Sequence, residues 1–474
     1  MTQLWQLGAA ALADGFRRGE FDPVDALEAC LDRVTACQPG LNAMLLVDAA
    51  GARTAAAASR ARWRAGQALG PLDGVPVSLK DNLHAAGLPT TWGSKLLQGF
   101  IAKHDEVPVA RLRAGGAVIF GKTNLPEFAL QGITDNLVAG ATRNPWDLSL
   151  TPGGSSGGAA AAVASGCAPL ALATDGGGST RRPASHTGVA GFKPSPGLIA
   201  RGGGLPEIFL DFEVPGILAR HAGDVLALSQ VLATPGHRLG HEPVRPARIL
   251  YVPRFAGHPV DSGIAGRVKE AAQHWAALGH QVEEAAPADW ADAVNEVWPM
   301  LSNAGLAWML AQAWQFPEFG LREGQAPDLA MCGAAARSNA AQGASAPATA
   351  LFEALSAVHA LKQRMDEIFS QHDFILTPAT AALPWKLGQP WPDVINGTSV
   401  GPRGHAVFTA FANAAGLPAI ALPCGFAGPL PTGFQLVGRP GADAALLALA
   451  LEYERAFPWH DAWPPEPVAT ITAP

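Results

Sequence analysis

The stretch TPGGSSGGAAAAVASGCAPLALATDGGGSTRRPAS, residues 151–185, carries the strongest structural signal in the chain. Two glycine-serine clusters, GGSSGG and DGGGST, stand on either side of a run of small apolar residues. Because such a run must be packed away from water, these clusters are not solvated linkers. The pattern predicts a helix from Gly157 to about Gly166, then a strand over APLALATD and a tight turn at 176–179.

The second cluster offers the backbone geometry of an oxyanion hole. Gly176, Gly177 and Gly178 have no Cβ, so the chain can bring several N–H donors close to one point. Ser179 ends this turn, where a carbonyl carbon would be presented. A serine hydroxyl is a poor nucleophile on its own, so this arrangement requires a base elsewhere in the chain.

Lys80 is the candidate base, because it ends the apolar stretch VPVSL at residues 75–79. A lysine has an ordinary pKa near 10.4, so it accepts protons at neutral pH only when its charged form is disfavoured. Full burial can lower the pKa of such a group by roughly 3–5 units, and serine–lysine pairs are a variant of the catalytic triad. The alternative is a strand-end lysine that points to water.

Ser155 and Ser156 lie near the predicted helix N-terminus, and both satisfy the G-x-S-x-G pattern of a serine esterase or α/β-hydrolase. That fold needs a later histidine, and His186, His221 and His405 are available. The preceding segment NPWDLSLTP contains two prolines and makes a poor strand. The esterase hypothesis is kept as an alternative to the serine–lysine hypothesis.

Residues 116–123, GAVIFGKT, match the string of a phosphate-binding loop. A working loop of this kind follows a strand and wraps phosphate with the backbone of small residues, whereas the intervening AVIF is itself the strand. We therefore expect Lys122 to be structural.

The rest of the chain mixes helical and strand patterns, which favours an α/β fold. We expect a single domain over residues 1–474, with N-terminal helices in 1–70, the main site in 71–205, and the remaining sheet and the specificity half in 206–474. Residues 290–315 read as a tryptophan-rich helix, and residues 320–350 as irregular.

The amino-acid composition indicates the class of protein and the compartment in which we expect it. Of the 474 residues, 48% are hydrophobic and 15% charged, which supports a large core and argues against disorder. The net charge of −7 does not suggest a polyanion or an anionic membrane surface as a partner. The five cysteines show no CxxC spacing, no signal peptide is evident, and no long apolar run occurs. These features predict a soluble cytoplasmic protein without a metal site.

Five motifs together resemble the amidase signature family: VSLKDN, GKTN, TRNPWD, TPGGSSGG and TDGGGSTRRPAS. The resemblance is strong over residues 70–205, with weaker similarity in TAFANAAGLPAIALPCGF and PTGFQLVGRPGAD. It implies the amidase-signature fold, a large central mixed β-sheet covered by α-helices on both faces.

The resemblance also implies a Ser-cisSer-Lys triad, with Lys80 as base, Ser155 as the bridging serine that follows a cis peptide, and Ser179 as nucleophile. By the same resemblance, the N–H groups of Gly176, Gly177, Gly178 and Ser179 form the oxyanion hole. Ser156 would support the lysine–serine network, and Asp175 and Arg181 would clamp the loop by an ion pair. Residue 176 departs from the family, which often has Ile, Val or Thr at this position. Arg182 is expected to be a surface charge.

The implied activity is hydrolysis of a linear carboxylic amide through a serine acyl-enzyme, with no cofactor. The expected partner is a small-molecule amide, with no direct nucleic-acid contact, no membrane, and a homodimer as an open possibility. The DGGGS turn resembles members that act on small cyclic or linear xenobiotic amides, and Trp residues in 290–314, Trp385 and Trp391 are candidates for a hydrophobic acyl site or for core packing. An alternative from the same family is the catalytic A subunit of a tRNA-dependent amidotransferase, which passes ammonia to a partner. Another is a catalytically silent binding protein.

Overall fold

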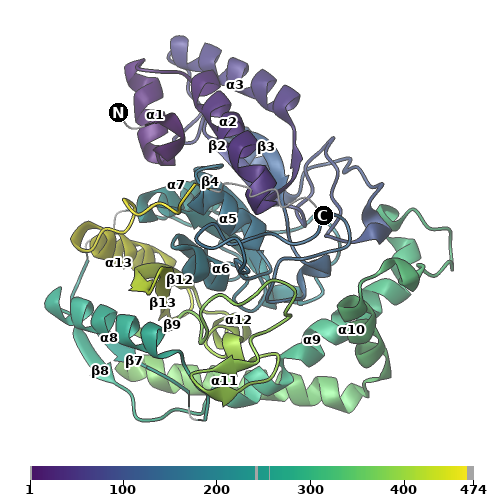
Figure 1. Cartoon of the computed structure of the whole chain (residues 1–474), viewed down its shortest axis with the longest axis vertical. Coiled ribbons are helices and arrows are strands. Elements are labelled where there is room, and N and C mark those ends of the chain that lie inside the picture. The colour runs from purple at the N-terminus through teal and green to yellow at the C-terminus, as the bar shows by residue number, and fades with distance from the viewer. Residues whose placement is uncertain (1–2, 241–243, 256, 467–474) are drawn as a thin grey trace.

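The computed structural model describes residues 3–240, 244–255 and 257–466 (Figure 1). Eleven strands of the described chain form one sheet, in the order β1-β3-β2-β4-β6-β5-β12-β13-β9-β7-β8. These strands are β1 Met44–Val47, β2 Pro76–Lys80, β3 Val118–Thr123, β4 Leu170–Asp175, β5 Ala190–Lys193, β6 Val214–Ala219, β7 Arg248–Tyr251, β8 Gln281–Glu284, β9 Phe374–Pro378, β12 Ala419–Ala427 and β13 Leu430–Gly438. A separate hairpin joins β10 Val394–Ile395 and β11 Thr398–Ser399.

The sheet is mixed. Parallel pairing joins β3 to β2 and β2 to β4 on one side, and β9 to β7 and β7 to β8 on the other. The pairs between these two groups are antiparallel, as is the pairing of β1 with β3. Strand β1 comes from residues 1–70 and β13 from the last part of the chain, so the sheet draws on all three predicted segments. The division into segments stays a prediction.

Helices cover the sheet on both faces, which confirms the predicted fold. The described helices are α1 Ala9–Arg18, α2 Pro23–Leu41, α3 Ala49–Arg64, α4 Val107–Ala114, α5 Gly157–Ala164, α6 Arg181–Thr187, α7 Ala222–Leu232, α8 Ser262–Ala277, α9 Asp292–Ala311, α10 Ala334–Ser345, α11 Ala348–Gln371, α12 Ala410–Ala414 and α13 Asp443–Ala456. The residues of β4 contact both faces of the sheet in turn, because neighbouring side chains of a strand point in opposite directions. Ala171 and Ala173 pack in one cluster with α5, whereas Leu170 and Leu172 pack in another with α7.

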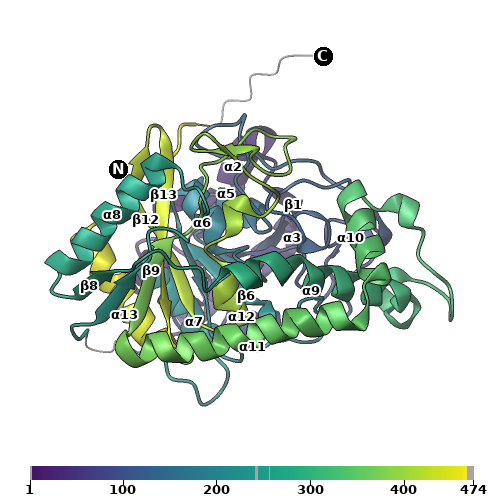
Figure 2. The ribbon, with the colours of Figure 1, turned by 90° about the horizontal axis from the view of Figure 1, so that it is seen from below.

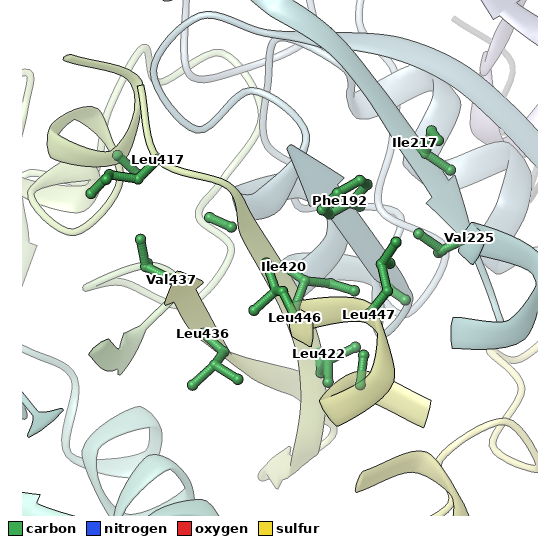
Figure 3. Packing of buried hydrophobic residues seen from close by; sticks show 14 of the residues in the cluster. Phe192, Ile217, Val225, Leu417, Ile420, Leu422, Leu436, Val437, Leu446 and Leu447 are labelled. Atoms are coloured by element: carbon green, nitrogen blue, oxygen red, sulfur yellow. The ribbon is translucent and has the colours of Figure 1, made fainter. Parts of the chain in front are cut away.

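The largest apolar cluster surrounds the middle of the sheet. Figure 3 shows Phe192 of β5, Ile420 of β12 and Leu436 of β13 near Leu446 and Leu447 of α13. Burying a side chain of this size contributes roughly 1.5–3 kcal/mol. This packing fixes the strands whose ends carry the polar residues discussed below.

Helices α9, α10 and α11 form one end of the molecule, and Figure 2 shows α9 and α11 side by side. Residues 320–350 were predicted to be irregular, but residues 334–345 form α10. The segment is rich in Ala, a strong helix former, and α10 is stabilised by packing on α9. Within the described ranges, every helix is too short or too polar to cross a lipid bilayer.

Candidate active site

Strands β2 and β4 are parallel neighbours, so their carboxyl ends lie at the same edge of the sheet. Lys80 is the last residue of β2, and Asp175 is the last residue of β4. The segment that carries Ser155 and Ser156 leads into α5, which lies against β2 and β4. Ser179 follows the turn after β4. Residues far apart in the sequence are therefore brought to one edge.

Lys80 is fully buried, and its Nζ lies 2.8 Å from Ser155 Oγ and 3.0 Å from Thr174 Oγ1. Burial lowers the pKa of Lys80 to about 7, against the opposing effect of the Glu213 carboxylate. At this pKa a large fraction of the amine is uncharged at neutral pH, so Lys80 can accept a proton.

The two serines of the first cluster have different surroundings. The Gly154–Ser155 peptide is cis, and the Ser155 hydroxyl faces Lys80. Ser156 was predicted to support the lysine–serine network, and its Oγ donates to the carbonyl oxygen of Thr174, the residue whose Oγ1 contacts Lys80, at 3.1 Å. Its backbone N–H donates to the Ser179 carbonyl oxygen at 3.1 Å. Ser156, the residue before α5, therefore joins the first glycine-serine segment to the second through its backbone and to β4 through its side chain.

A buried ion pair holds the second glycine turn. Arg181 Nη2 lies 2.9 Å from Asp175 Oδ1, and both side chains are fully buried. Burial alone would raise the pKa of Asp175, but the Arg181 guanidinium holds that pKa well below its ordinary value. Arg181 also donates to the side chains of Asn413 and Gln435. The pair thus ties the turn to α12 and β13, in the positions predicted for a clamp.

The four N–H groups of this turn are not equivalent. Gly178 N–H donates to Asp175 Oδ1 at 2.6 Å, and Gly177 N–H approaches the same oxygen at 3.3 Å. Within the described part of the chain, the N–H groups of Gly176 and Ser179 have no hydrogen-bond acceptor. The Asp175 carboxylate thus accepts the N–H groups of both Gly177 and Gly178, and of the four predicted donors those of Gly176 and Ser179 stay available to an oxyanion.

The turn borders a cavity of about 1060 Å³. Four residues of the two glycine-serine clusters line it: Ser155, Gly176, Gly177 and Ser179. Three aromatic side chains also line the cavity, Phe209, Trp298 and Trp391, and Trp298 Nε1 donates to the Gly176 carbonyl oxygen at 3.2 Å. Phe209 and Trp298 stack with ring centroids 5.7 Å apart. Of the predicted tryptophans, Trp298 and Trp391 reach the cavity, Trp385 packs in the interior, and Trp308 is exposed.

Sequence reasoning missed a chain of buried polar groups that starts at Thr174. Asn82 Nδ2 donates to Thr174 Oγ1 at 2.9 Å and lies 3.4 Å from Glu213 Oε1. Glu213 pairs with Arg201 at 3.2 Å and lines the cavity. Asn82 lies within VSLKDN, but no local pattern marks Glu213 or Arg201, because their partners are distant in sequence.

Arg182 was expected on the surface, and this expectation is wrong. Its side chain is 5% exposed and lines the cavity. Its guanidinium donates to the carbonyl oxygens of Gly177 at 2.7 Å and Gly154 at 3.3 Å. A charged residue at the start of α6 is buried here because both glycine segments fold against that helix.

The esterase hypothesis requires a histidine that hydrogen bonds to Ser155 or Ser156. No such bond occurs among the described residues. His186 contacts the Ala382 carbonyl oxygen at 3.0 Å, and burial lowers the pKa of His186 to about 4. His221 contacts Glu454. The Ser155 hydroxyl faces Lys80 instead, so this geometry favours serine–lysine chemistry.

One group in the described residues could hold a metal ion, away from the turn. Ligand atoms of His221, Glu454 and His460 lie within 4.8 Å of one another. They line a second cavity beside α7 and α13. The carboxylates nearest Lys80 and Ser179 are those of Asp175 and Glu213, and each is paired with an arginine, Arg181 and Arg201.

Known proteins match the chain over almost its full length. The A subunit of the glutamyl-tRNA(Gln) amidotransferase from Symbiobacterium thermophilum is 35% identical, covering 97% of this chain and 98% of that protein. The protein of the same name from Roseiflexus castenholzii is also 35% identical, covering 98% of each chain. The sequence analysis expected a small-molecule amide as the partner, no direct contact with nucleic acid, and left a homodimer open. The names of these relatives show that this expectation of partners is wrong. The relatives are subunits of a larger enzyme named for a tRNA.

Solved structures agree with the fold. A 6-aminohexanoate cyclic dimer hydrolase in complex with substrate has a TM-score of 0.85 and 28% identity, covering 98% of this chain and 99% of that one. A bacterial aryl acylamidase of the amidase signature enzymes has a TM-score of 0.87 and 27% identity, covering 96% and 97%. The Amidase family profile matches residues 25–447. The chain therefore belongs to the amidase signature family of enzymes, hydrolases of carbon–nitrogen bonds.

Proposed function

We propose that the chain hydrolyses a carboxamide through an acyl-enzyme on Ser179, with Ser155 and Lys80 moving the proton. The observation that carries this proposal is the 2.8 Å contact between Ser155 Oγ and the buried Lys80 Nζ. Burial lowers the pKa of Lys80 to about 7, which matches a general base to neutral pH.

The proposed reaction begins when Ser179 Oγ attacks the amide carbon and its proton passes through Ser155 to Lys80. The negative oxygen of the tetrahedral intermediate accepts hydrogen bonds from the N–H groups of Gly176 and Ser179, which have no acceptor among the described residues. The proton then returns through Ser155 to the leaving nitrogen, and the C–N bond breaks to leave an ester on Ser179. Water attacks this ester, again losing a proton towards Lys80, and the acid is released. Losing one oxyanion donor typically lowers the rate by about 10²–10³.

We propose glutamine, a carboxamide, as the substrate. Relatives that cover at least 97% of this chain are named as the A subunit of a glutamyl-tRNA(Gln) amidotransferase. We propose that this chain has the corresponding role, releasing ammonia from glutamine for transfer to a glutamyl-tRNA held with partner subunits.

The first experiment measures ammonia from glutamine for the purified chain, with Ser179→Ala as control. It then asks whether the chain, combined with the other amidotransferase subunits of its own organism, converts glutamyl-tRNA(Gln) to glutaminyl-tRNA(Gln). Ammonia release and conversion are expected. Failure of both, with intact hydrolysis of other amides, would contradict this role.

A second candidate is hydrolysis of aryl or aliphatic amides by the chain alone. The stacked pair Phe209 and Trp298 in the cavity wall favours it, because aromatic walls suit hydrophobic acyl or aryl groups. A hydrolysis screen over anilides, aliphatic primary amides and cyclic amides tests it. Turnover of an anilide well above that of glutamine would favour this candidate over the first.

A further inference from the structure

The second cavity, beside α7 and α13, has an acidic wall. Its volume is about 1060 Å³, and it shares no lining residue with the cavity that contains Ser179. His221 and His460 line it, and the charged residues of its wall are four carboxylates and one arginine: Asp224, Glu452, Glu454, Asp461 and Arg455. An excess of carboxylates in a concave wall attracts cations.

Arg220 fixes the chain after α13 beside the start of α7. Its Nη2 donates to the carbonyl oxygens of His460 at 2.6 Å and Ala462 at 2.8 Å. Trp459 Nε1 donates in return to the Arg220 carbonyl oxygen at 2.8 Å. Because His221 follows Arg220 directly, these bonds hold His460 next to His221, and their ring centroids lie 4.7 Å apart.

The Glu454 carboxylate lies between the two imidazoles. Its Oε2 accepts the N–H of Ala222 at 2.9 Å, which fixes the group. Its Oε1 lies 3.2 Å from His221 Nδ1 and 3.8 Å from His460 Nδ1. Two ligand atoms on one tetrahedral zinc ion, with bonds of about 2.0–2.2 Å, lie roughly 3.3–3.6 Å apart. The two distances from Glu454 Oε1 lie on either side of this range.

His460 has a ring nitrogen without a use in the hydrogen-bond network. Its Nδ1 is buried and has no hydrogen-bond partner among the described residues, because Glu454 Oε1 at 3.8 Å is too distant. A buried polar atom without a partner is unfavourable. Asp461 Oδ1 lies 3.9 Å from the other ring nitrogen, Nε2. Imidazoles that bind a metal commonly have a carboxylate near their second nitrogen.

We propose that His221, Glu454 and His460 bind one Zn²⁺, with water in the remaining position. The ion takes the place of the hydrogen bond between His221 and Glu454 and gives His460 Nδ1 a partner. Two imidazoles and a carboxylate are a zinc ligand set, whereas Mg²⁺ and Ca²⁺ prefer oxygen ligands.

The ion joins the chain after α13 to the start of α7, and this role does not depend on amide hydrolysis at Ser179. The sequence analysis expected no metal site. His221 and Glu454 are 233 residues apart, so no sequence motif contains both ligands.

The first test is calorimetric titration of the untagged chain with ZnCl₂, after treatment with EDTA and transfer to metal-free buffer. One ion should bind per chain with a Kd of about 1 μM or tighter. MgCl₂ and CaCl₂ should not bind at this site. Absence of Zn²⁺ binding would overturn the inference.

Variants locate the ion. His221→Gln and His460→Gln should each weaken Zn²⁺ binding by more than the roughly 10–100-fold that an outer-shell partner contributes. His359→Gln is the matched control, because it removes an exposed histidine of α11 and should leave the Kd unchanged. Unchanged affinity in both of the first two variants would place the ion elsewhere and overturn the inference.

Hydrogen exchange tests the link to the chain after α13. Zn²⁺ at 100 times its Kd should slow amide exchange in residues 457–463 by up to about 100-fold in the unmodified protein, and should not slow it in His460→Gln. Binding of Zn²⁺ without slower exchange in this segment would overturn the proposed link. Neither result depends on amidase activity, so failure of the proposed function would leave this site to be judged by its own tests.

Discussion

Lys80 and Lys122 lie on neighbouring parallel strands, and both are fully buried. The register pairs Leu79 with Lys122 and Lys80 with Thr123, so the two lysines point to opposite faces of the sheet. Lys122 Nζ lies 3.0 Å from Asp81 Oδ1 and 2.9 Å from Thr90 Oγ1. Lys80 faces two hydroxyls. The same residue type therefore serves as half of an ion pair on one face and as a candidate base on the other.

Lys193, at the end of β5, shows that a lowered pKa is not sufficient. Burial, followed by the charge of Arg181, lowers the pKa of Lys193 to about 7. Its Nζ donates to the Pro194 carbonyl oxygen, and it does not line the cavity. What distinguishes Lys80 is the contact with Ser155, a hydroxyl that reaches the cavity. Burial lowers the pKa of the amine, but the amine can act as a base only where a neighbouring hydroxyl, here that of Ser155, can donate a proton to it.

The largest expected effect is on Ser179 itself. Ser179→Ala removes the attacking oxygen, so kcat on any amide substrate should fall at least about 10⁴-fold while the protein stays folded. A fluorophosphonate should add its mass to Ser179 in the unmodified enzyme and fail to label this variant. Substantial turnover by Ser179→Ala would show that another residue is the nucleophile. The proposed role of Lys80 as the base for Ser179 would then also be wrong.

The comparison of Lys80 with Lys122 predicts opposite outcomes for one substitution. Lys80→Met should lower kcat by about 10²–10⁴, the usual contribution of a general base, with a free energy of unfolding changed by no more than about 2 kcal/mol. Chemical denaturation and steady-state kinetics on the same preparation measure both.

Lys122→Met is the matched control. It leaves the Asp81 carboxylate buried without its ammonium, so the free energy of unfolding should fall by about 3–5 kcal/mol. The fraction that remains folded should turn over far faster than Lys80→Met. If Lys122→Met were stable but inactive, and Lys80→Met active, the roles assigned to the two faces would be reversed.

The pH dependence should follow Lys80. With its pKa lowered to about 7, the amine is protonated and cannot act as a base at lower pH. Therefore kcat/KM should fall about tenfold per pH unit below 7 and reach a plateau above about pH 8. Rates measured from pH 5.5 to 9 test this. A flat profile down to pH 5.5 would exclude Lys80 as the titrating base.

The smallest expected effect comes from Glu213, whose carboxylate favours the charged form of Lys80. Glu213→Gln removes that charge and keeps an amide near Asn82, so the pKa of Lys80 should fall further and the acid limb should move to lower pH. Arg201 retains Glu106 and Glu207 as partners, each at 3.5 Å. A limb that moves to higher pH would show that Glu213 acts on Lys80 by another route.

Local pattern was sufficient for much of the fold. The alternation of apolar runs and glycine turns predicted α5, β4 and the turn at 176–179, because these elements depend on neighbours in sequence. It failed at α10, where alanine content and packing on α9 prevailed over the expected irregular chain. It also failed at Arg182, whose burial depends on two segments folding against α6.

The sequence by itself determined that a lysine ends a hydrophobic strand and that two glycine-serine clusters flank a buried helix and strand, because strand period and glycine turns are local properties. The tertiary structure decided which lysine lacks a carboxylate partner, which of the four N–H groups are free, and that Arg182 is buried against the cavity. These features depend on the charges and the burial that distant parts of the chain contribute, and a local sequence pattern does not contain that information.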